Sequence, residues 1–136
     1  RPFRTSLELA SMVRRINKQR RGVKIDPATK TFQALRIHVN DEMEVLQKGL
    51  EQAISSLAQG SRLVVISYHS LEDRIAKNIL RRESTDCLCP TQVLQCMCDH
   101  HAIIKRITKK PIVPSEIEVR ENPRSRSARL RIVERK

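Results

Sequence analysis

One stretch, residues 62–74, constrains the fold of this chain more than any other, because it reads in turn as a strand, a polar junction and a helix. Residues 63–66 form an unbroken apolar run, which is typical of a parallel strand covered by helices on both faces. The helix that we predict next runs to about residue 82, with Ser70 and Asp73 as its capping pair. The stretch therefore predicts an α/β fold.

His69 and Ser70 lie at the junction between that strand and that helix. In open α/β sheets, ligands bind at the carboxyl ends of the strands. We therefore expect His69 and Ser70 to lie on the substrate side of the fold.

The charge of the chain narrows the choice of partner. Its 136 residues, 39% of them hydrophobic, suffice for one modest domain or for part of one. The 27 Lys and Arg residues against 15 Asp and Glu residues leave a net charge of +12, which favours a polyanion, with nucleic acid first. No segment approaches the roughly 20 apolar residues of a spanning helix, and we recognise no signal peptide, so we expect no membrane partner. The chain opens on Arg1 rather than Met, which favours a piece of a longer protein.

The first 25 residues predict a short helix at residues 5–16 and then a basic cluster that includes Arg20 and Arg21. Such a cluster is either a solvated connection or part of an RNA-binding surface. It has no interleaved aromatic residue, so we expect no base stacking there.

A single long helix is predicted from Asp26 to Gly60, with a bend near Asn40. Its first half carries polar residues that are candidates for a site, notably Gln33, Arg36 and Asn40. Their spacing also fits ordinary surface positions.

All four cysteines of the chain fall in one short segment: Cys87, Cys89, Cys96 and Cys98. Four thiols can bind zinc tetrahedrally, and His100 and His101 lie nearby in the sequence. The C-x-C spacing is tighter than the two-residue spacing of most zinc knuckles and is less diagnostic. Reduced loop cysteines or a disulfide pair are the alternatives, and reduced thiols suit a cytosolic protein.

The last third predicts a strand at 102–108, a short helix capped by Ser115, and a final strand at 128–133 in which Arg alternates with apolar residues. That alternation predicts one wet face. The connection before the last strand holds five candidates for binding phosphate: Asn122, Arg124, Ser125, Arg126 and Ser127. Guanidiniums and hydroxyls match phosphate oxygens, although serine–arginine runs are also common in flexible basic loops.

Three stretches together carry a resemblance to a known family: residues 26–42, residues 62–74 and residues 110–131. In this order they resemble the small-subunit ribosomal RNA cytosine-N4 methyltransferases, also known as MraW or RsmH, over nearly the whole chain. Two departures are mild, because Ser61 stands where a second glycine is usual and Tyr68 where phenylalanine is usual.

The resemblance implies the C-terminal half of a Rossmann-like class I methyltransferase sheet, preceded by the end of a helical insertion domain. Residues 1–25 would end the helical substrate-recognition insertion, and residues 26–136 would form the C-terminal half of the catalytic domain. The glycine-rich turn that binds S-adenosylmethionine in such enzymes has no counterpart among the 3 glycines of this chain. We therefore expect the cofactor site to lie mostly in a missing N-terminal half.

The implied activity of the full-length enzyme is methylation of N4 of a cytidine in the decoding region of small-subunit rRNA, with this chain on the substrate side and inactive alone. By this analogy the candidates of the long helix face the cleft, His69 and Ser70 lie near a flipped cytosine, and residues 122–127 cover the substrate. We assign no catalytic residue.

The partners implied are small-subunit rRNA or the ribosomal subunit, together with the missing N-terminal half. No membrane partner is implied, and the question of a homodimer stays open. The expected location is the bacterial cytoplasm, or an organelle in a eukaryote. Two other functions stay open: an RNA-binding fragment without activity, and a zinc-stabilised interaction module.

Overall fold

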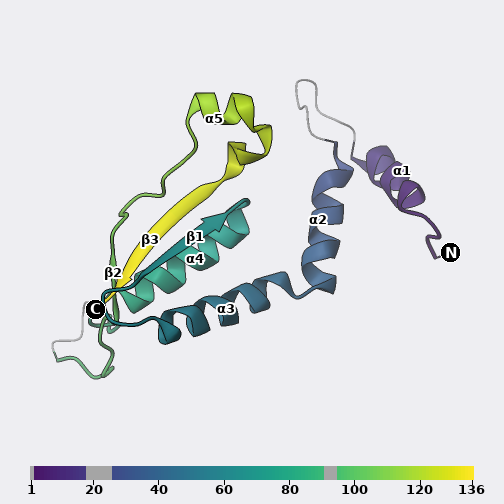
Figure 1. The fold of residues 1–136 in the computed structure, drawn as a ribbon. Coiled ribbons are helices and arrows are strands. Elements are labelled where there is room, and N and C mark those ends of the chain that lie inside the picture. The colour runs from purple at the N-terminus through teal and green to yellow at the C-terminus, as the bar shows by residue number, and fades with distance from the viewer. Residues whose placement is uncertain (1, 18–25, 91–94) are drawn as a thin grey trace. The chain divides into compact units, whose positions relative to one another are not determined.

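The computed structural model of the chain describes residues 2–17, 26–90 and 95–136 (Figure 1). It divides into two compact units, Arg1–Glu42 and Met43–Lys136, and each is described by itself. The helices and strands are α1 (Ser6–Ile16), α2 (Ala28–Val39), α3 (Glu42–Ser56), β1 (Arg62–Ser67), α4 (Ser70–Glu83), β2 (Ile104–Arg106), α5 (Glu116–Glu121), the 3₁₀ helix η1 (Pro123–Ser127) and β3 (Arg129–Arg135).

The first unit consists of α1 and α2. As predicted, α1 begins after Thr5, whose hydroxyl accepts a hydrogen bond from the Glu8 N–H at 3.2 Å. Asp26 starts α2, because its Oδ1 accepts from the Ala28 N–H at 2.8 Å. Small side chains close the contact between the two helices, and the apolar cluster there comprises Ala10, Val13 and Ala28 with Leu9 and Phe32 against it.

The prediction of one long helix to Gly60 is wrong, because the chain breaks between α2 and α3. Asn40 ends α2, and its N–H donates to the Arg36 carbonyl at 3.1 Å. Asp41 then takes a left-handed backbone conformation, with φ of 47°. Asp and Asn tolerate that conformation better than other side chains do, so the pair ends one helix before the next begins, and the helix is not continuous.

The sheet of the second unit has three strands in the order β1-β3-β2, and β3 pairs antiparallel with both neighbours. The parallel pairing predicted for β1 is therefore wrong within the described sheet. So is the covering of β1 on both faces, because Val64 and Ile66 are each 51% exposed. One face of β1 packs on helices and the other is open in this chain.

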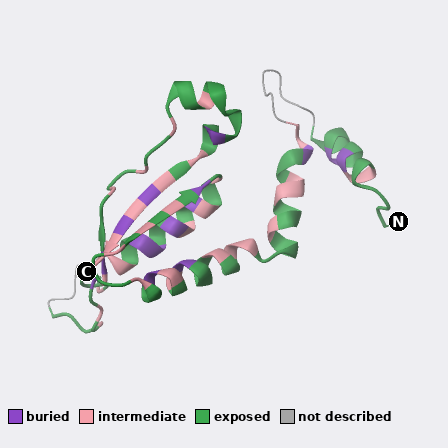
Figure 2. Cartoon of the chain, in the orientation of Figure 1, coloured by how far each residue is buried: buried purple, intermediate pink, exposed green. Residues whose placement is uncertain are grey.

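The core lies between the covered face of the sheet and the helices α3 and α4, as the purple residues of these elements show in Figure 2. Ile54, Ile104 and Val133 are its most deeply buried large side chains. The apolar cluster is completed by Leu50, Ala76, Ile79 and Leu80, with Leu46, Leu63, Val65, Ile75 and Ile103 packed against it.

The wet face predicted for the arginines of the last strand is wrong at Arg131, which is buried on the same face as Val133. The register explains this placement, since Arg131 lies opposite Val65 and Val133 opposite Leu63, both on the helix-covered face. The apolar residues Leu130 and Ile132 lie on the open face and are half-buried.

Other predicted elements are present with small changes. Ser115 caps α5 by accepting from the Glu118 N–H at 3.2 Å. Residues 123–127 form η1 rather than an irregular loop. Within the described ranges, no helix is both long and apolar enough to cross a membrane.

Candidate functional site

The carboxyl end of β1 is closed by a capping arrangement at the start of α4. His69, not the predicted Ser70, is the cap residue, and its Nδ1 accepts from the Glu72 N–H at 3.4 Å. In return, Glu72 Oε2 accepts from the Tyr68 N–H at 2.8 Å and the His69 N–H at 3.2 Å. Ser70 is the exposed first residue of α4. The junction is thus held rigidly by backbone donors and one carboxylate.

Both ring nitrogens of His69 face groups of its own helix turn. Since Nδ1 accepts from a backbone N–H, the proton of the neutral ring belongs on Nε2. Nε2 lies 3.0 Å from Glu72 Oε1 at an angle that makes no hydrogen bond, and it is a buried atom without a hydrogen-bond partner in the described chain. The contacts that the structure gives His69 are thus those of a helix cap.

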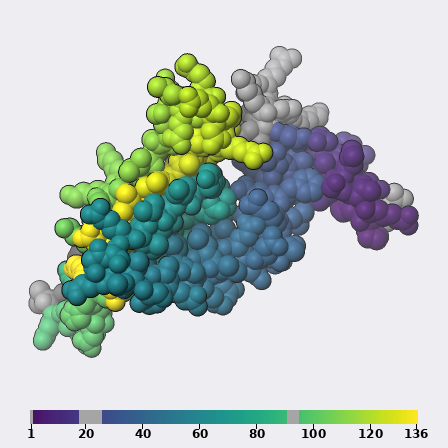
Figure 3. All heavy atoms as spheres, viewed as in Figure 1, coloured from purple at the N-terminus to yellow at the C-terminus, as the bar shows by residue number. Residues whose placement is uncertain are grey.

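The predicted phosphate-binding segment reaches the same edge of the sheet. Ser67, the last residue of β1, pairs with Arg129, the first residue of β3, and η1 ends two residues earlier at Ser127. The capped junction and η1 therefore flank the same end of the β1–β3 pair. In Figure 3, α5 and η1 form a yellow-green surface knob beside the start of β3.

The five candidates, Asn122 before η1 and four residues within it, divide into two kinds. The Asn122 side chain accepts from the Arg124 N–H at 3.3 Å, and the buried Ser125 hydroxyl donates to the Asn122 carbonyl at 2.8 Å, so these two hold the turn. Arg124, Arg126 and Ser127 are exposed. Neither guanidinium has an ion pair in the part of the chain that the structure describes, so both are available to a phosphate.

Sequence reasoning missed the ion cluster beneath this edge. Asp73 Oδ1 accepts from Arg131 Nε at 2.8 Å, Oδ2 accepts from Arg131 Nη2 at 3.2 Å, and Arg129 Nη1 donates to Oδ2 at 3.1 Å. The Arg131 hydrogen bonds hold the pKa of the Asp73 carboxyl below its usual value, against the opposing effect of burial, and Arg129 adds to the lowering. The only sequence signal for this cluster is the alternation of arginines in β3, which by itself predicts a wet face.

The candidates of α2 belong to the first unit. Arg36 donates through Nε and Nη2 to the two carboxylate oxygens of Glu42, at 2.7 and 3.1 Å, and Asn40 Nδ2 lies 3.4 Å from the same carboxylate. Gln33 and Arg36 line a hollow of about 590 Å³ beside the Arg14–Asp26 ion pair. The structure thus brings these three together locally, and it leaves their place relative to His69 a prediction. Arg20 and Arg21 lie outside the described residues.

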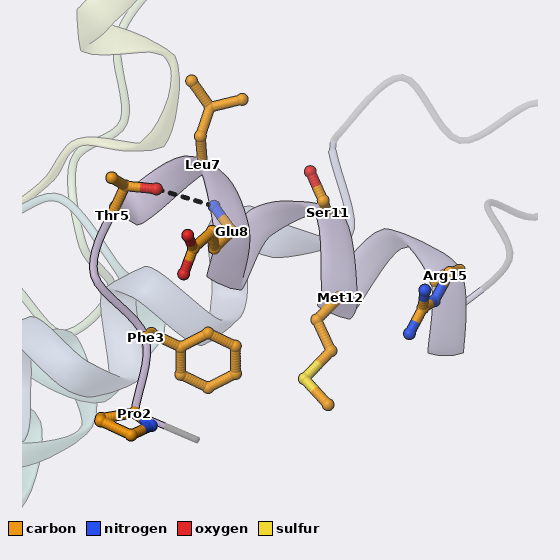
Figure 4. A pocket seen from close by; sticks show the side chains of 8 residues that line it. All are labelled: Pro2, Phe3, Thr5, Leu7, Glu8, Ser11, Met12 and Arg15. Carbon is orange, nitrogen blue, oxygen red and sulfur yellow. Dashed lines mark hydrogen bonds between the residues drawn. The ribbon is translucent and has the colours of Figure 1, made fainter.

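A second hollow of the first unit, of about 610 Å³, lies along α1 (Figure 4). Figure 4 shows the Phe3 ring and the Met12 side chain on one side of it. Phe3 is 51% and Met12 41% exposed. The lining is mixed, with apolar and polar side chains in equal number: Pro2, Phe3, Leu7 and Met12, and Thr5, Glu8, Ser11 and Arg15.

The four cysteines converge in the connection between α4 and β2. Their Sγ atoms all lie within 4.8 Å of one another, and none is in a disulfide. Backbone N–H donors, from Leu88 first and then from His100, lower the pKa of the Cys98 thiol to about 6. At Cys87 the Cys89 N–H also lowers the pKa, but the neighbouring thiols outweigh it and raise the pKa to about 12. We call these four residues the four-thiol cluster.

The described residues do not fit an S-adenosylmethionine cradle. A dinucleotide-like or adenosyl cradle needs a glycine turn directly after a strand. Gly49 is inside α3, and Gly60 precedes β1, with φ of 76° at the turn into the strand.

These features define a mixed α/β chain whose sheet ends in a helix-capped junction beside a basic 3₁₀ turn. The chain belongs to the MraW methylase family, whose sequence model matches residues 1–136.

Similar proteins support this membership. The chain is 52% identical to a protein from Dehalococcoides mccartyi over 135 aligned residues. The alignment covers 99% of this chain and 38% of that relative. The chain is 51% identical to one from Thermomicrobium roseum, covering 98% of this chain and 41% of the relative. It is 46% identical to one from Clostridioides difficile, covering 99% of this chain and 44% of the relative. All three are called ribosomal RNA small subunit methyltransferase H, and the chain spans about two fifths of their length.

Proposed function

We propose that this chain is the substrate-side part of an S-adenosylmethionine-dependent methyltransferase that modifies N4 of a cytidine in the decoding region of small-subunit rRNA. One observation carries the proposal. Two of the three sequence stretches that carry the resemblance, residues 62–74 and 110–131, meet at one edge of the sheet, because Ser67 pairs with Arg129. The names and the similarity of the relatives support rRNA as the substrate.

The chain's own residues would hold the RNA. Arg124 and Arg126 are exposed on a turn that Asn122 and Ser125 fix from within, so their guanidiniums meet phosphate with little loss of backbone entropy. Such contacts position the RNA without reading its sequence. His69 and Ser70 would lie beside the target base, with Gln33, Arg36 and Asn40 as further contacts, and residues 1–25, with Arg20 and Arg21, as the end of a helical recognition domain.

The rest of the protein would supply the cofactor site and cover the sheet. The open face shows Val64 and Ile66, each 51% exposed, together with Ile112, which is 52% exposed and bridges to Leu130. β1 is also an edge strand of the described sheet, so its outer edge is free to continue the sheet. An N-terminal half packed against this face and this edge would account for both features.

The proposed location is the bacterial cytoplasm, where ribosomal subunits are assembled.

The activity is tested with the full-length protein, small ribosomal subunits and S-adenosylmethionine, by mass spectrometry of the digested rRNA. We expect one new N4-methylated cytidine. A methyl group on another atom or another base would contradict the proposal.

The role of η1 is tested by replacing both Arg124 and Arg126 with Ala and measuring RNA affinity over a series of salt concentrations. Each lost phosphate contact lowers the logarithmic salt slope by roughly 0.7 to 0.9, so we expect a drop of up to about two units and weaker binding of any RNA of suitable shape. The matched control replaces both Lys105 and Arg106 with Ala, which removes the same amount of positive charge. These two residues lie in β2, which pairs with the end of β3 farthest from η1. Equal losses from both double variants, or none from the first, would contradict a specific role for η1.

A further inference from the structure

We propose that the four-thiol cluster binds one zinc ion, which orders the connection between α4 and β2. The proposal is independent of methyl transfer, because this connection joins β2, the strand farthest from β1 in the sheet order. It rests on the arrangement of the sulfurs, on the backbone donors around them and on the exposure of the described apolar side chains beside them.

Three sulfurs form a triangle of nearly equal edges. Cys87 and Cys96 are 3.4 Å apart, Cys96 and Cys98 3.5 Å, and Cys98 and Cys87 3.9 Å. Cys89 lies within 4.8 Å of each of them. A zinc ion with Zn–S bonds of about 2.3 Å at tetrahedral angles needs sulfurs about 3.8 Å apart, so the observed separations need only small adjustments.

The backbone supports the cluster in a reciprocal way. The Leu88 N–H, in the middle of one C-x-C, donates to Cys98 of the other at 3.3 Å. The Met97 N–H, in the middle of the second C-x-C, donates to Cys89 of the first at 3.4 Å. Hydrogen bonds to sulfur stabilise its thiolate form, which is the form that binds metal. The tight C-x-C spacing therefore works here because each pair's central amide supports the other pair.

Among the described residues of the segment that holds the cluster, the hydrogen bonds that do not involve the sulfurs lie at its base. Its base is fixed, since His100 Nε2 lies 2.9 Å from the Arg82 carbonyl and the Ala102 N–H donates to Asp86 at 3.1 Å. Beside the cysteines, two described apolar side chains face solvent, since Leu88 is 46% and Met97 83% exposed. A long connection without a core needs a cross-link to stay in one conformation, and a structural zinc supplies one.

Disulfides fit this arrangement less well. A disulfide joins two sulfurs at about 2.05 Å and satisfies only one neighbour of each, whereas three of these sulfurs are nearly equidistant from one another. Zinc needs no oxidant. The ion exchanges with the protons of whichever thiols are still protonated, and four Zn–S bonds form without any change of oxidation state.

The experiment measures metal in the full-length protein, purified under reducing conditions without chelator. We expect elemental mass spectrometry to find about one equivalent of zinc. We also expect the cobalt-substituted protein to show the visible absorption of a tetrahedral tetrathiolate site. Replacing Cys89 or Cys96 by Ser, one from each pair, should weaken zinc binding by at least about 100-fold. Even the mutation of a residue that only hydrogen-bonds a metal ligand typically lowers metal affinity 10- to 100-fold. The control His101→Ala, an exposed residue outside the cluster, should keep wild-type affinity.

Several results would overturn the proposal. They are metal-free folded protein that takes up neither zinc nor cobalt, iron in place of zinc, a disulfide between these cysteines in the freshly purified protein, or equal loss of affinity in His101→Ala. The cobalt spectrum of the wild-type protein decides the matter even if a Cys variant fails to fold. Normal rRNA methylation by a zinc-free protein would leave the proposed function intact, so the two proposals fail separately.

Discussion

Replacing Asp73 by Ala should destabilise the protein more than any other single change at the sheet edge. Asp73 on α4 is 8% exposed in its side chain and bonds two arginines of β3. The replacement leaves Arg131, 11% exposed, as a buried charge without its partner. Breaking a buried pair in this way costs about 3–5 kcal/mol, a large share of the stability of a domain.

Arg129 provides the matched comparison, since it bonds the same carboxylate from a side chain that is 51% exposed. An exposed ion pair contributes under about 1 kcal/mol, so Arg129→Ala should cost little. Replacing Asp73 and Arg131 together by Leu and Met removes both buried charges and should recover much of the loss, because well-packed apolar residues often substitute for a buried ion pair.

Urea unfolding of the full-length protein, followed by circular dichroism, gives these free energies for each variant at one salt concentration. The reasoning is refuted if Asp73→Ala costs less than about 1 kcal/mol, or if Arg129→Ala costs as much as Asp73→Ala. Either outcome would mean that water screens the Asp73–Arg131 pair.

Two further predictions concern acid and the helix break. The pKa of Asp73 is lowered in the fold, so the stability that its carboxylate contributes is complete above the unfolded pKa of about 3.9 and is lost as pH falls through the lower folded pKa. The difference in free energy of unfolding between the wild type and Asp73→Asn should therefore be constant from about pH 6 to 8 and shrink below about pH 4. A difference that grows in acid would contradict this sign. At the break, Asp41→Gly should leave the free energy of unfolding within about 0.5 kcal/mol or raise it, whereas Asp41→Val should lower it by about 1–2 kcal/mol; equal effects would show that the left-handed backbone is not maintained in solution.

The sequence predicted the starts of elements best, because a helix start depends on side chains next to it. Thr5 and Ser115 cap their helices where the pattern places them, and Asp26 accepts from the first N–H of α2, although Pro27 is the cap residue there. His69 escaped because cap rules favour small polar side chains, although Glu72 at the third helical position was a usable signal. The break at Asp41 escaped for a related reason, since the apolar spacing of α2 continues into α3 and hides a change in backbone direction.

Features that depend on strand pairing were harder to predict. Alternation in β3 shows that two faces differ, but it does not say which face meets the helices. The helix-covered face took Arg131 because Asp73 neutralises it there, and one carboxylate on α4 thus reversed the expected orientation. A charged residue in a strand indicates a wet face only when no opposite charge faces it from the covering helix.

The apolar run of β1 shows what a local pattern reports. Val64 and Ile66 point away from the helices of this chain, and yet they are as apolar as Leu63 and Val65, which pack on them. A strand selected to have one wet side would place polar residues at alternate positions. The residues of β1 therefore fit a strand with both faces covered, while the described chain covers only one. The relatives are more than twice as long as this chain, and under the proposed function the rest of the protein would supply the second cover of β1.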